Sequence, residues 1–169
     1  MGRVKSKATG GTPATVALER AGVSYTVCSY THDPGVESYG LEAAQALGVD
    51  PARVFKTLLV DTDSGLVVGV VSVAQSLDLK AVAAALGSKR ATMADPRVAE
   101  RATGYVVGGI SPIGQKKALP TVVDASASAY ETILVSGGKR GFDIELAPTD
   151  LVALTGATVA QISRETGHR

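Results

Sequence analysis

Two apolar segments joined by a short polar turn constrain the fold of this chain more than any other feature. VFKTLLV at 54–60 and LVVGVVSVA at 66–74 flank the sequence DTDSG at 61–65. Two β-rich runs separated by polar residues and a glycine predict a hairpin. The second run is apolar at almost every position, as expected of a strand that is covered on both faces. We therefore predict that this hairpin forms the centre of a β-sheet.

Helix caps and β-rich runs mark the remaining elements. Thr12 followed by Pro13 is typical of a helix start, and Asp95-Pro96 repeats the pattern. We predict helices at 12–21, 38–47, 78–86, 95–103 and 149–154, and further strands at 23–30, 105–107, 121–124, 132–136 and 142–146. This irregular order lacks the regular alternation of a doubly wound sheet. It predicts an α+β fold with a mixed sheet and helices packed around it.

The length and composition indicate a single domain. The chain has 169 residues, 45% of them hydrophobic, and no apolar run approaches the ~18 residues that would span a bilayer. Residues 1–11 are basic and rich in small side chains, so we predict a flexible N-terminal arm followed by one domain at 12–169. Without a signal-peptide core near its start, the protein is expected to be cytoplasmic and to have no membrane partner.

The cysteine and histidine content excludes two common kinds of site. Cys28 is the only cysteine, which rules out an internal disulfide framework. With only His32 and His168 beside it, the sequence offers no set of zinc ligands, and we expect no metal. Cys28 lies in a β-rich run, where a small buried hydrophobic residue is commoner than a nucleophile.

The charge is unevenly distributed along the chain. The formal net charge is only +1, but residues 88–141 hold eight Lys or Arg against four Asp or Glu. Clustered cations are the electrostatic footprint of a polyanion such as RNA. A solvated surface of mixed charge explains the same count and is the commoner case.

Lys56 is the most informative single residue. Alternation along 54–60 puts it on one face of the strand with Val54 and Leu58, so the lysine has apolar neighbours. A partly buried ammonium is costly unless it meets an anion or a carbonyl, and such positions tend to be functional. The alternative is a lysine whose head group reaches solvent near a strand end.

Two glycine-rich loops and one histidine motif are further candidates. GGISPIGQKK at 108–117 could cradle an oxyanion with its N–H groups, or be an ordinary structured loop. SGGKRGFDIEL at 136–146 leads into a strand rather than a helix, so it is not a phosphate-binding P-loop. His32-Asp33-Pro34 is interpreted as a turn, because adjacent side chains rarely form a triad and no motif supplies a nucleophilic serine.

Taken together, four segments resemble one known family. HDP at 32–34, VFKTLLV at 54–60, MADPRVAERATGYVVGGISPIGQKKALPTVVDA at 93–125 and SGGKRGFDIELAPTDL at 136–151 resemble the YbaK family of aminoacyl-tRNA deacylases in order and spacing. The resemblance spans Thr12 to about Arg164. It implies the domain associated with prolyl-tRNA synthetase, an α+β fold whose mixed sheet is partly barrel-like.

The resemblance also implies an activity and a set of site residues. Family members hydrolyse the ester between a wrong amino acid and the tRNA 3' end, and the family's catalytic lysine matches Lys56. The residues that match substrate-binding positions of the family are Tyr30, Gly108, Gly109, Ile110, Ser111 and Asp143. The lysines and arginine that we expect to contact tRNA are Lys116, Lys117, Lys139 and Arg140. No cofactor is required, because the substrate is already an activated ester.

The form of the 108–117 loop favours one substrate within this family. It is similar to the branch that clears cysteine, so Cys-tRNA(Pro) is the first expectation, with attack by the substrate's own thiol and a lyase-like release. Ala-tRNA(Pro) or Ser-tRNA is the alternative, because a pocket discriminates poorly between small side chains. Prolyl-tRNA synthetase is expected as a partner, and DNA is not. A non-catalytic RNA-binding module and a hydrolase of small esters or thioesters remain open as other functions.

Overall fold

The structure, a computed structural model, describes residues 11–36 and 38–165 and the backbone alone of 3–5. The helices are α1 Pro13–Ala21, α2 Tyr39–Leu47, α3 Leu79–Ala85, α4 Pro96–Thr103 and α5 Pro148–Thr155, with short 3-10 helices η1 Pro51–Arg53 and η2 Ala125–Ala129. The strands are β1 Arg3–Lys5, β2 Thr26–Ser29, β3 Phe55–Thr62, β4 Gly65–Ser72, β5 Gln75–Leu77, β6 Ala91–Met93, β7 Thr121–Asp124, β8 Ile133–Lys139, β9 Phe142–Leu146, β10 Thr158–Ala160 and β11 Ser163–Glu165. None of the described helices is long and apolar enough to cross a membrane.

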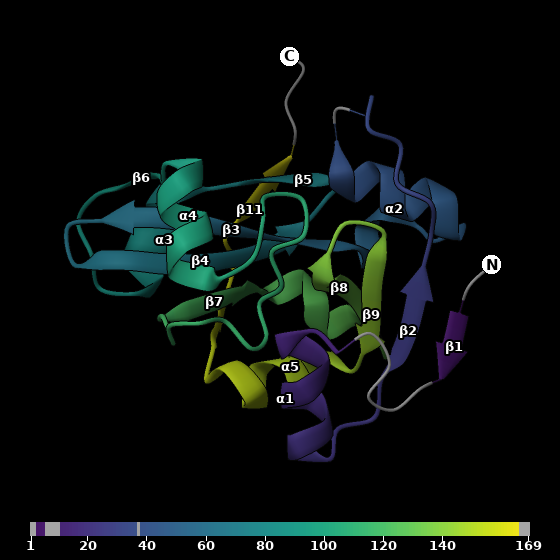
Figure 1. Ribbon diagram of the computed structural model, residues 1–169. Helices are drawn as coiled ribbons and strands as arrows, with labels where there is room; N and C mark the ends of the chain where they lie inside the picture. The colour runs from purple at the N-terminus through teal and green to yellow at the C-terminus, as the bar shows by residue number, and fades with distance from the viewer. Residues whose placement is uncertain (1–2, 6–10, 37, 166–169) are drawn as a thin grey trace.

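The strands form two larger sheets and one small one. The order is β10-β7-β4-β3-β6 in the five-stranded sheet, β1-β2-β9-β8 in the four-stranded sheet, and β11-β5 in the small sheet. Figure 1 shows the two larger sheets side by side, with α2 at one end and α1 and α5 below. The β4–β7 and β7–β10 pairs are parallel and the others in the five-stranded sheet are antiparallel, so this sheet is mixed, as predicted.

The predicted hairpin is confirmed at the centre of the five-stranded sheet. β3 and β4 pair from Phe55 opposite Ser72 to Thr62 opposite Gly65. Six of the eight residues of β4 are buried, because both faces of the sheet are covered. α4 packs through Ala99 on the face that carries Leu59, and α3 packs through Val82 on the opposite face.

The predicted caps are confirmed at the ends of the helices. Thr12 accepts a hydrogen bond from the Thr15 N–H at the start of α1, and Asp95 accepts one from the Arg97 N–H at the start of α4. α1 and α4 both end at a glycine in the left-handed region. The elements that the sequence analysis did not predict are the 3-10 helices η1 and η2 and the short strands β1, β5, β6, β10 and β11.

Two expectations about the fold need correction. The strand predicted at 105–107 is wrong: the chain turns there, and the Tyr105 hydroxyl donates to Ile113 O at 2.7 Å, which anchors a loop instead. Barrel-like closure is not supported, because each sheet of the described chain has two end strands and none closes. The flexible arm predicted at 1–11 lies mostly outside the described residues, and within it Arg3–Lys5 pairs with β2.

Asp124 ties the C-terminal segment to the five-stranded sheet. It is 2% exposed at the end of β7, and its Oδ1 accepts from the N–H groups of Ile162 at 2.8 Å and Ser163 at 3.0 Å. Its Oδ2 accepts from the Ser126 N–H at 3.1 Å. Burial raises the pKa of this carboxyl, but the hydrogen bonds that it accepts outweigh burial and hold the pKa below its ordinary value. One buried carboxylate therefore joins three segments.

We predict that Asp124→Ala lowers the free energy of unfolding by about 2–4 kcal/mol, because buried N–H groups lose a charged acceptor. Urea unfolding measures the loss. Asp63→Ala is the matched control: Asp63 also accepts two backbone N–H groups, from Lys89 and Arg90, but it is fully exposed. Its loss should be clearly smaller, and equal losses would contradict the importance of burial.

Candidate active site

A cavity lies where one edge of β3 is left without a strand partner. On one side β3 pairs along its whole length with β4, but on the other it pairs with β6 only from Val60 to Thr62. Further along, Val54 forms an isolated bridge to Leu134 of β8. Between these points the described chain supplies no strand for this edge, so the two larger sheets separate there.

The opening holds a cavity of about 310 Å³. This volume is at the small end of the range for ligand sites, and the wall is mainly apolar, as such walls usually are. The lining comes from β3, α2, α4, the segments at 93–96 and 107–110, the residue that follows β2, and one residue each of β8 and β9. Apart from the helix cap Ser38, its polar side chains are Tyr30, Tyr39, Lys56, Thr57, Ser136 and Asp143. Its size suits a small ligand.

Lys56 lies in the cavity wall. Its side chain is half-buried, and burial lowers the pKa of its ammonium from the ordinary 10.5. Within the described ranges, its Nζ has no ion pair or hydrogen bond. An ammonium that is partly removed from water without a partner costs free energy, which a ligand's anion or carbonyl oxygen can recover. The surroundings of Lys56 therefore favour binding over a lysine that only reaches for solvent.

Asp143 is the centre of a second polar group. Ser136 and Asp143 are directly opposite in the β8–β9 pair, so their side chains share one face. Asp143 is 6% exposed, and burial raises the pKa of its carboxyl from 3.8 to about 7. Burial also raises the pKa of the Tyr30 phenol, and the carboxylates of Asp143 and Glu42 add to this effect. A ligand cation at this end of the cavity would return the Asp143 pKa toward its ordinary range.

The loop after α4 brings main-chain donors to the cavity. The Gly109 N–H donates to Val106 O at 2.8 Å, and Gly108 has a φ of +89°, so 106–109 form a type II turn. Gly108 and Ile110 line the cavity. No acceptor for the N–H of either residue is found among the residues described. Both N–H groups therefore lack a partner in the described protein and belong to residues of the cavity wall.

The two other predicted loop residues lie behind this surface. A Cβ on Gly109 would come within 2.7 Å of Lys139 Cα, so this glycine permits the loop to pack against the β8–β9 turn. Ser111 is fully buried, and its hydroxyl accepts from the Ile113 N–H at 3.2 Å. Neither residue lines the cavity. Their predicted contact with a substrate stays a prediction, and the geometry gives them supporting positions.

His32 and Cys28 lie outside the cavity lining, as the sequence analysis expected. The His32 Nδ1 lies 2.9 Å from Glu42 Oε1, and the second oxygen of Glu42 accepts from the Asp33 N–H at 2.6 Å. Asp33 in turn accepts from the Gly35 N–H, which makes the motif a turn. Cys28 is fully buried in β2. In the described chain, no group of three or more His, Cys, Asp or Glu could hold a metal ion.

The four predicted tRNA-contacting residues are exposed, but they differ in what they bind. Lys116 and Lys117 lie in the loop that follows the cavity loop, and Lys139 lies 5.0 Å from the centroid of the Phe142 ring. Arg140 donates two hydrogen bonds to Val107 O, at 2.9 Å and 2.7 Å. The charge of Arg140 is therefore already engaged by the protein.

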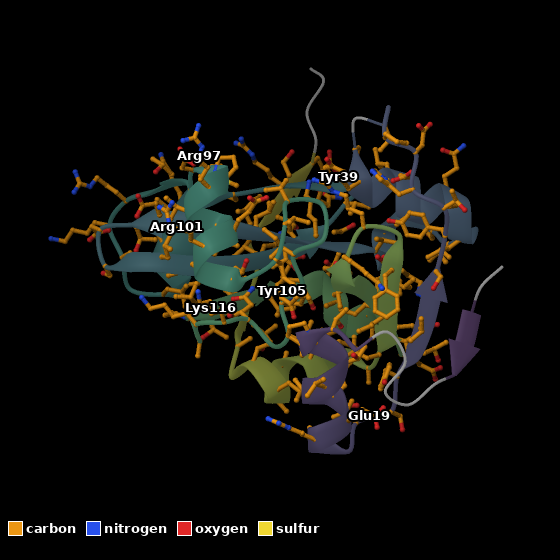
Figure 2. The ribbon with its side chains drawn as sticks, in the orientation of Figure 1. Glu19, Tyr39, Arg97, Arg101, Tyr105 and Lys116 are labelled. Carbon is orange, nitrogen blue, oxygen red and sulfur yellow. The ribbon has the colours of Figure 1, made fainter. Side chains whose placement is uncertain are left out.

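Several further residues were missed by the sequence analysis. Arg97 and Arg101 are exposed on α4, the helix that contributes Pro96 and Ala99 to the cavity wall, and Figure 2 shows both arginines on this helix. Their spacing of four residues in a predicted helix was a usable signal. Ser136 lies opposite Asp143, a position that depends on the register of the bulged β8–β9 pair. Thr57, whose hydroxyl is buried without a partner among the described residues, gave no sequence signal.

Comparison with known proteins identifies a family that this chain matches. The model of the aminoacyl-tRNA editing domain matches residues 33–154. EbsC of Enterococcus faecalis (strain ATCC 700802 / V583), whose name proposes a Cys-tRNA(Pro)/Cys-tRNA(Cys) deacylase, is 46% identical over 121 residues, which are 71% of this chain and 74% of that protein.

Two solved structures are also similar over most of the chain. One is described as a proposed trans-editing enzyme for prolyl-tRNA synthetase; it has a TM-score of 0.79 at 28% identity and covers 90% of this chain and 95% of its own. The other, a hypothetical protein, has a TM-score of 0.80 at 25% identity, with 90% and 99% covered. The likeness therefore extends beyond the segment that the family model matches.

We predict that Asp143→Asn becomes more stable relative to the wild type as the pH rises from about 4 to 7. A carboxyl whose pKa is raised from 3.8 to about 7 holds its proton in the folded state over this range but not when unfolded, so the wild type loses stability as the pH rises. At about 1.4 kcal/mol for each tenfold change in proton affinity, the full difference is about 4 kcal/mol. Urea unfolding at each pH measures it.

The control for this titration is Asp63→Asn. Hydrogen bonds from the N–H groups of Arg90 and Lys89 lower the pKa of this exposed carboxyl from 3.8. Its titration is then nearly complete above about pH 5, so the difference between this variant and the wild type should stay flat. A flat difference for Asp143→Asn as well would contradict a raised Asp143 pKa.

Proposed function

The chain belongs to the aminoacyl-tRNA editing domain family, and we propose that it hydrolyses Cys-tRNA(Pro) as a free-standing deacylase that edits in trans. One observation carries the proposal: Lys56, half-buried and without a partner among the described residues, shares a small cavity with the unpaired N–H groups of Gly108 and Ile110. These are the donors that the hydrolysis of an ester needs. The name of EbsC supports cysteine as the amino acid.

The geometry suits an ester carbonyl with an ammonium beside it. In the proposed complex, Lys56 and the N–H groups of Gly108 and Ile110 hold the carbonyl oxygen, where negative charge develops in the transition state. The α-ammonium of the aminoacyl group lies at the other end, near Asp143 and Ser136. Binding therefore supplies Lys56 with an electron-rich oxygen and Asp143 with a cation, and both buried groups gain a partner.

We propose that the nucleophile comes from the substrate. The cysteinyl sulfur attacks the ester carbon, the bond between that carbon and the ribose oxygen breaks, and the thiol proton leaves with the ribose oxygen. The product is a four-membered cyclic thioester, which water opens to cysteine. Lys56 can relay this proton: because burial lowers its pKa, it gives a proton to the leaving oxygen more readily than an exposed lysine, and the thiol proton replaces the one that it gave. No cofactor enters these steps.

The tRNA body would lie over the basic surface beside the cavity, in the cytoplasm. We propose Lys116, Lys117 and Lys139 as contacts to the tRNA backbone, with Arg97 and Arg101 of α4 as additional contacts (Figure 2). These cations follow the phosphate backbone without reading its sequence. Prolyl-tRNA synthetase would then present tRNA(Pro), a partner hinted at by the description of one similar structure.

We predict that Lys56→Ala reduces the release of cysteine from Cys-tRNA(Pro) by about 100-fold or more in kcat, because the carbonyl oxygen loses its cation. Deacylation of Cys-tRNA(Pro), Ala-tRNA(Pro) and Pro-tRNA(Pro) is measured at equal concentrations for both proteins. Only cysteine should be released, since alanine and proline lack a thiol. Equal release of alanine would favour the Ala- or Ser-tRNA deacylase.

The same experiment separates the other functions. A binding module would leave all three tRNAs charged even with prolyl-tRNA synthetase added, and Lys56→Ala would then weaken only tRNA affinity. A hydrolase of small esters would cleave free cysteine esters as well as the tRNA ester. Either result contradicts the proposal.

We predict that Lys116→Ala raises the KM for Cys-tRNA(Pro) several-fold with little change in kcat. Losing one phosphate contact should also lower the slope of log KM against log salt concentration by about 0.7–0.9. Lys80→Ala is the matched control, because Lys80 is an exposed lysine on α3, on the opposite face of the five-stranded sheet. Equal effects for the two variants would show a contribution of net charge rather than a contact.

A further inference from the structure

We infer that Arg140 and Glu100 are positioning residues that fix the orientation of the Gly108 N–H in the cavity wall. Both side chains bind the main chain of Val107, and we call this pair of contacts the Val107 clamp. Its effect on catalysis rests on the proposed function, whereas its effect on the turn at 106–109 does not.

The clamp holds both polar atoms of one residue. The Val107 N–H donates to Glu100 Oε2 at 2.8 Å, and Val107 O accepts from Arg140 Nε at 2.9 Å and Nη2 at 2.7 Å. Glu100 lies on α4, and Arg140 lies in the turn between β8 and β9. Two elements that line the cavity therefore fix the loop from two sides. Hydrogen bonds that involve a charged group are stronger than those between neutral groups, which favours one conformation of the loop.

The peptide that Arg140 binds is the one that the turn leaves free to rotate. Val107 and Gly108 are the central residues of the type II turn over 106–109. Type I and type II turns differ mainly by a flip of this central peptide, and the positive φ of Gly108 allows the type II form. The Val107 carbonyl and the Gly108 N–H belong to this same trans peptide, so they point in opposite directions. Holding the carbonyl on one side thus keeps the N–H on the other.

Arg140 also has an electronic effect on the same peptide. A guanidinium on the carbonyl oxygen polarises the amide, which makes the Gly108 N–H a stronger donor. Gly108 lines the cavity, and its N–H has no acceptor within the described chain. The residue therefore acts on a substrate oxygen through the backbone and does not need to touch it.

The packing around Gly108 supports a single conformation. A Cβ on this residue would lie 2.8 Å from the Tyr39 ring and 2.9 Å from Arg140 Nε. The Arg140 guanidinium in turn lies 5.1 Å from the centroid of the Tyr39 ring. Tyr39 begins α2 and lines the cavity itself (Figure 2). The arginine is thus held by a cation–π contact and a forked pair of hydrogen bonds, and lysine cannot reproduce the fork.

The kinetic test compares Arg140→Ala and Arg140→Lys with Lys139→Met. We expect both Arg140 variants to lose kcat about 10- to 100-fold on Cys-tRNA(Pro) with KM nearly unchanged, because the donor is misplaced while the surface is kept. Lys139 is the neighbouring exposed cation, and its side chain lies against Phe142 rather than the loop. Its loss should raise KM and keep kcat. Restored activity in Arg140→Lys, or a rise in KM alone, would show that Arg140 contacts tRNA through its charge and would overturn the inference.

Glu100 supplies an independent variant of the same clamp. Glu100→Gln keeps an acceptor for the Val107 N–H, so it should retain kcat within about twofold to threefold, whereas Glu100→Ala should lose about 10-fold. Melting temperatures verify that each variant folds. If Gln and Ala behave alike, the hydrogen bond to Val107 is not what matters.

A structural measurement separates the clamp from the proposed function. In ¹H–¹⁵N spectra of the ¹⁵N-labelled protein, the Gly108 amide resonance should move in both Arg140 variants, but not in Lys139→Met. If the wild type fails to deacylate Cys-tRNA(Pro) while these changes occur, the proposed function fails and the clamp stands. If Gly108 is unchanged in both Arg140 variants, the clamp is wrong whatever the activity.

Discussion

The unpaired edge of β3 is the constraint on which the site depends. β3 must pair with β4 over its whole length to build the core, yet on its other side strand pairing stops between Val54 and Val60. A strand edge in this position has to be covered or used. Here α2, α4 and the 106–110 loop close around it without filling it, and the cavity results. Lys56 lies on the strand itself, so the position of its backbone is fixed by the central hairpin.

Rigid and adjustable parts of the site follow from this arrangement. Lys56, Ser136 and Asp143 are held by strand pairing, whose register leaves little freedom. The donors at 108–110 are on a loop, where a peptide can rotate at small cost. Side-chain contacts from neighbouring elements are needed only there, and the structure has them on Val107. The opposite shifts of the Lys56 and Asp143 pKa values fit the same scheme, since burial acts on both groups and a ligand with a carbonyl oxygen and an ammonium would relieve both.

Local sequence patterns were sufficient to predict the helices and the central hairpin, but not every contact between side chains. Caps and apolar runs predicted the helices and the β3–β4 hairpin, because these depend on residues close in sequence. The strand predicted at 105–107 was wrong because β propensity does not supply a partner strand, and Tyr105 uses its hydroxyl to anchor a loop instead. Ser136 was missed because its place in the cavity depends on lying opposite Asp143, which requires the register of a hairpin with a bulge.

The charged residues show most clearly what could not be predicted from the sequence alone. Residues 88–141 are rich in cations, and the sequence treats Lys139 and Arg140 as equivalent neighbours. Their contacts differ: one side chain lies over Phe142 at the surface, and the other is committed to Val107 and Tyr39. An arginine whose N–H donors already bind the protein still attracts a polyanion through its charge, but it can form few new hydrogen bonds with it. We therefore expect Arg140 to contribute less to the proposed tRNA surface than Lys139, Lys116 and the arginines of α4.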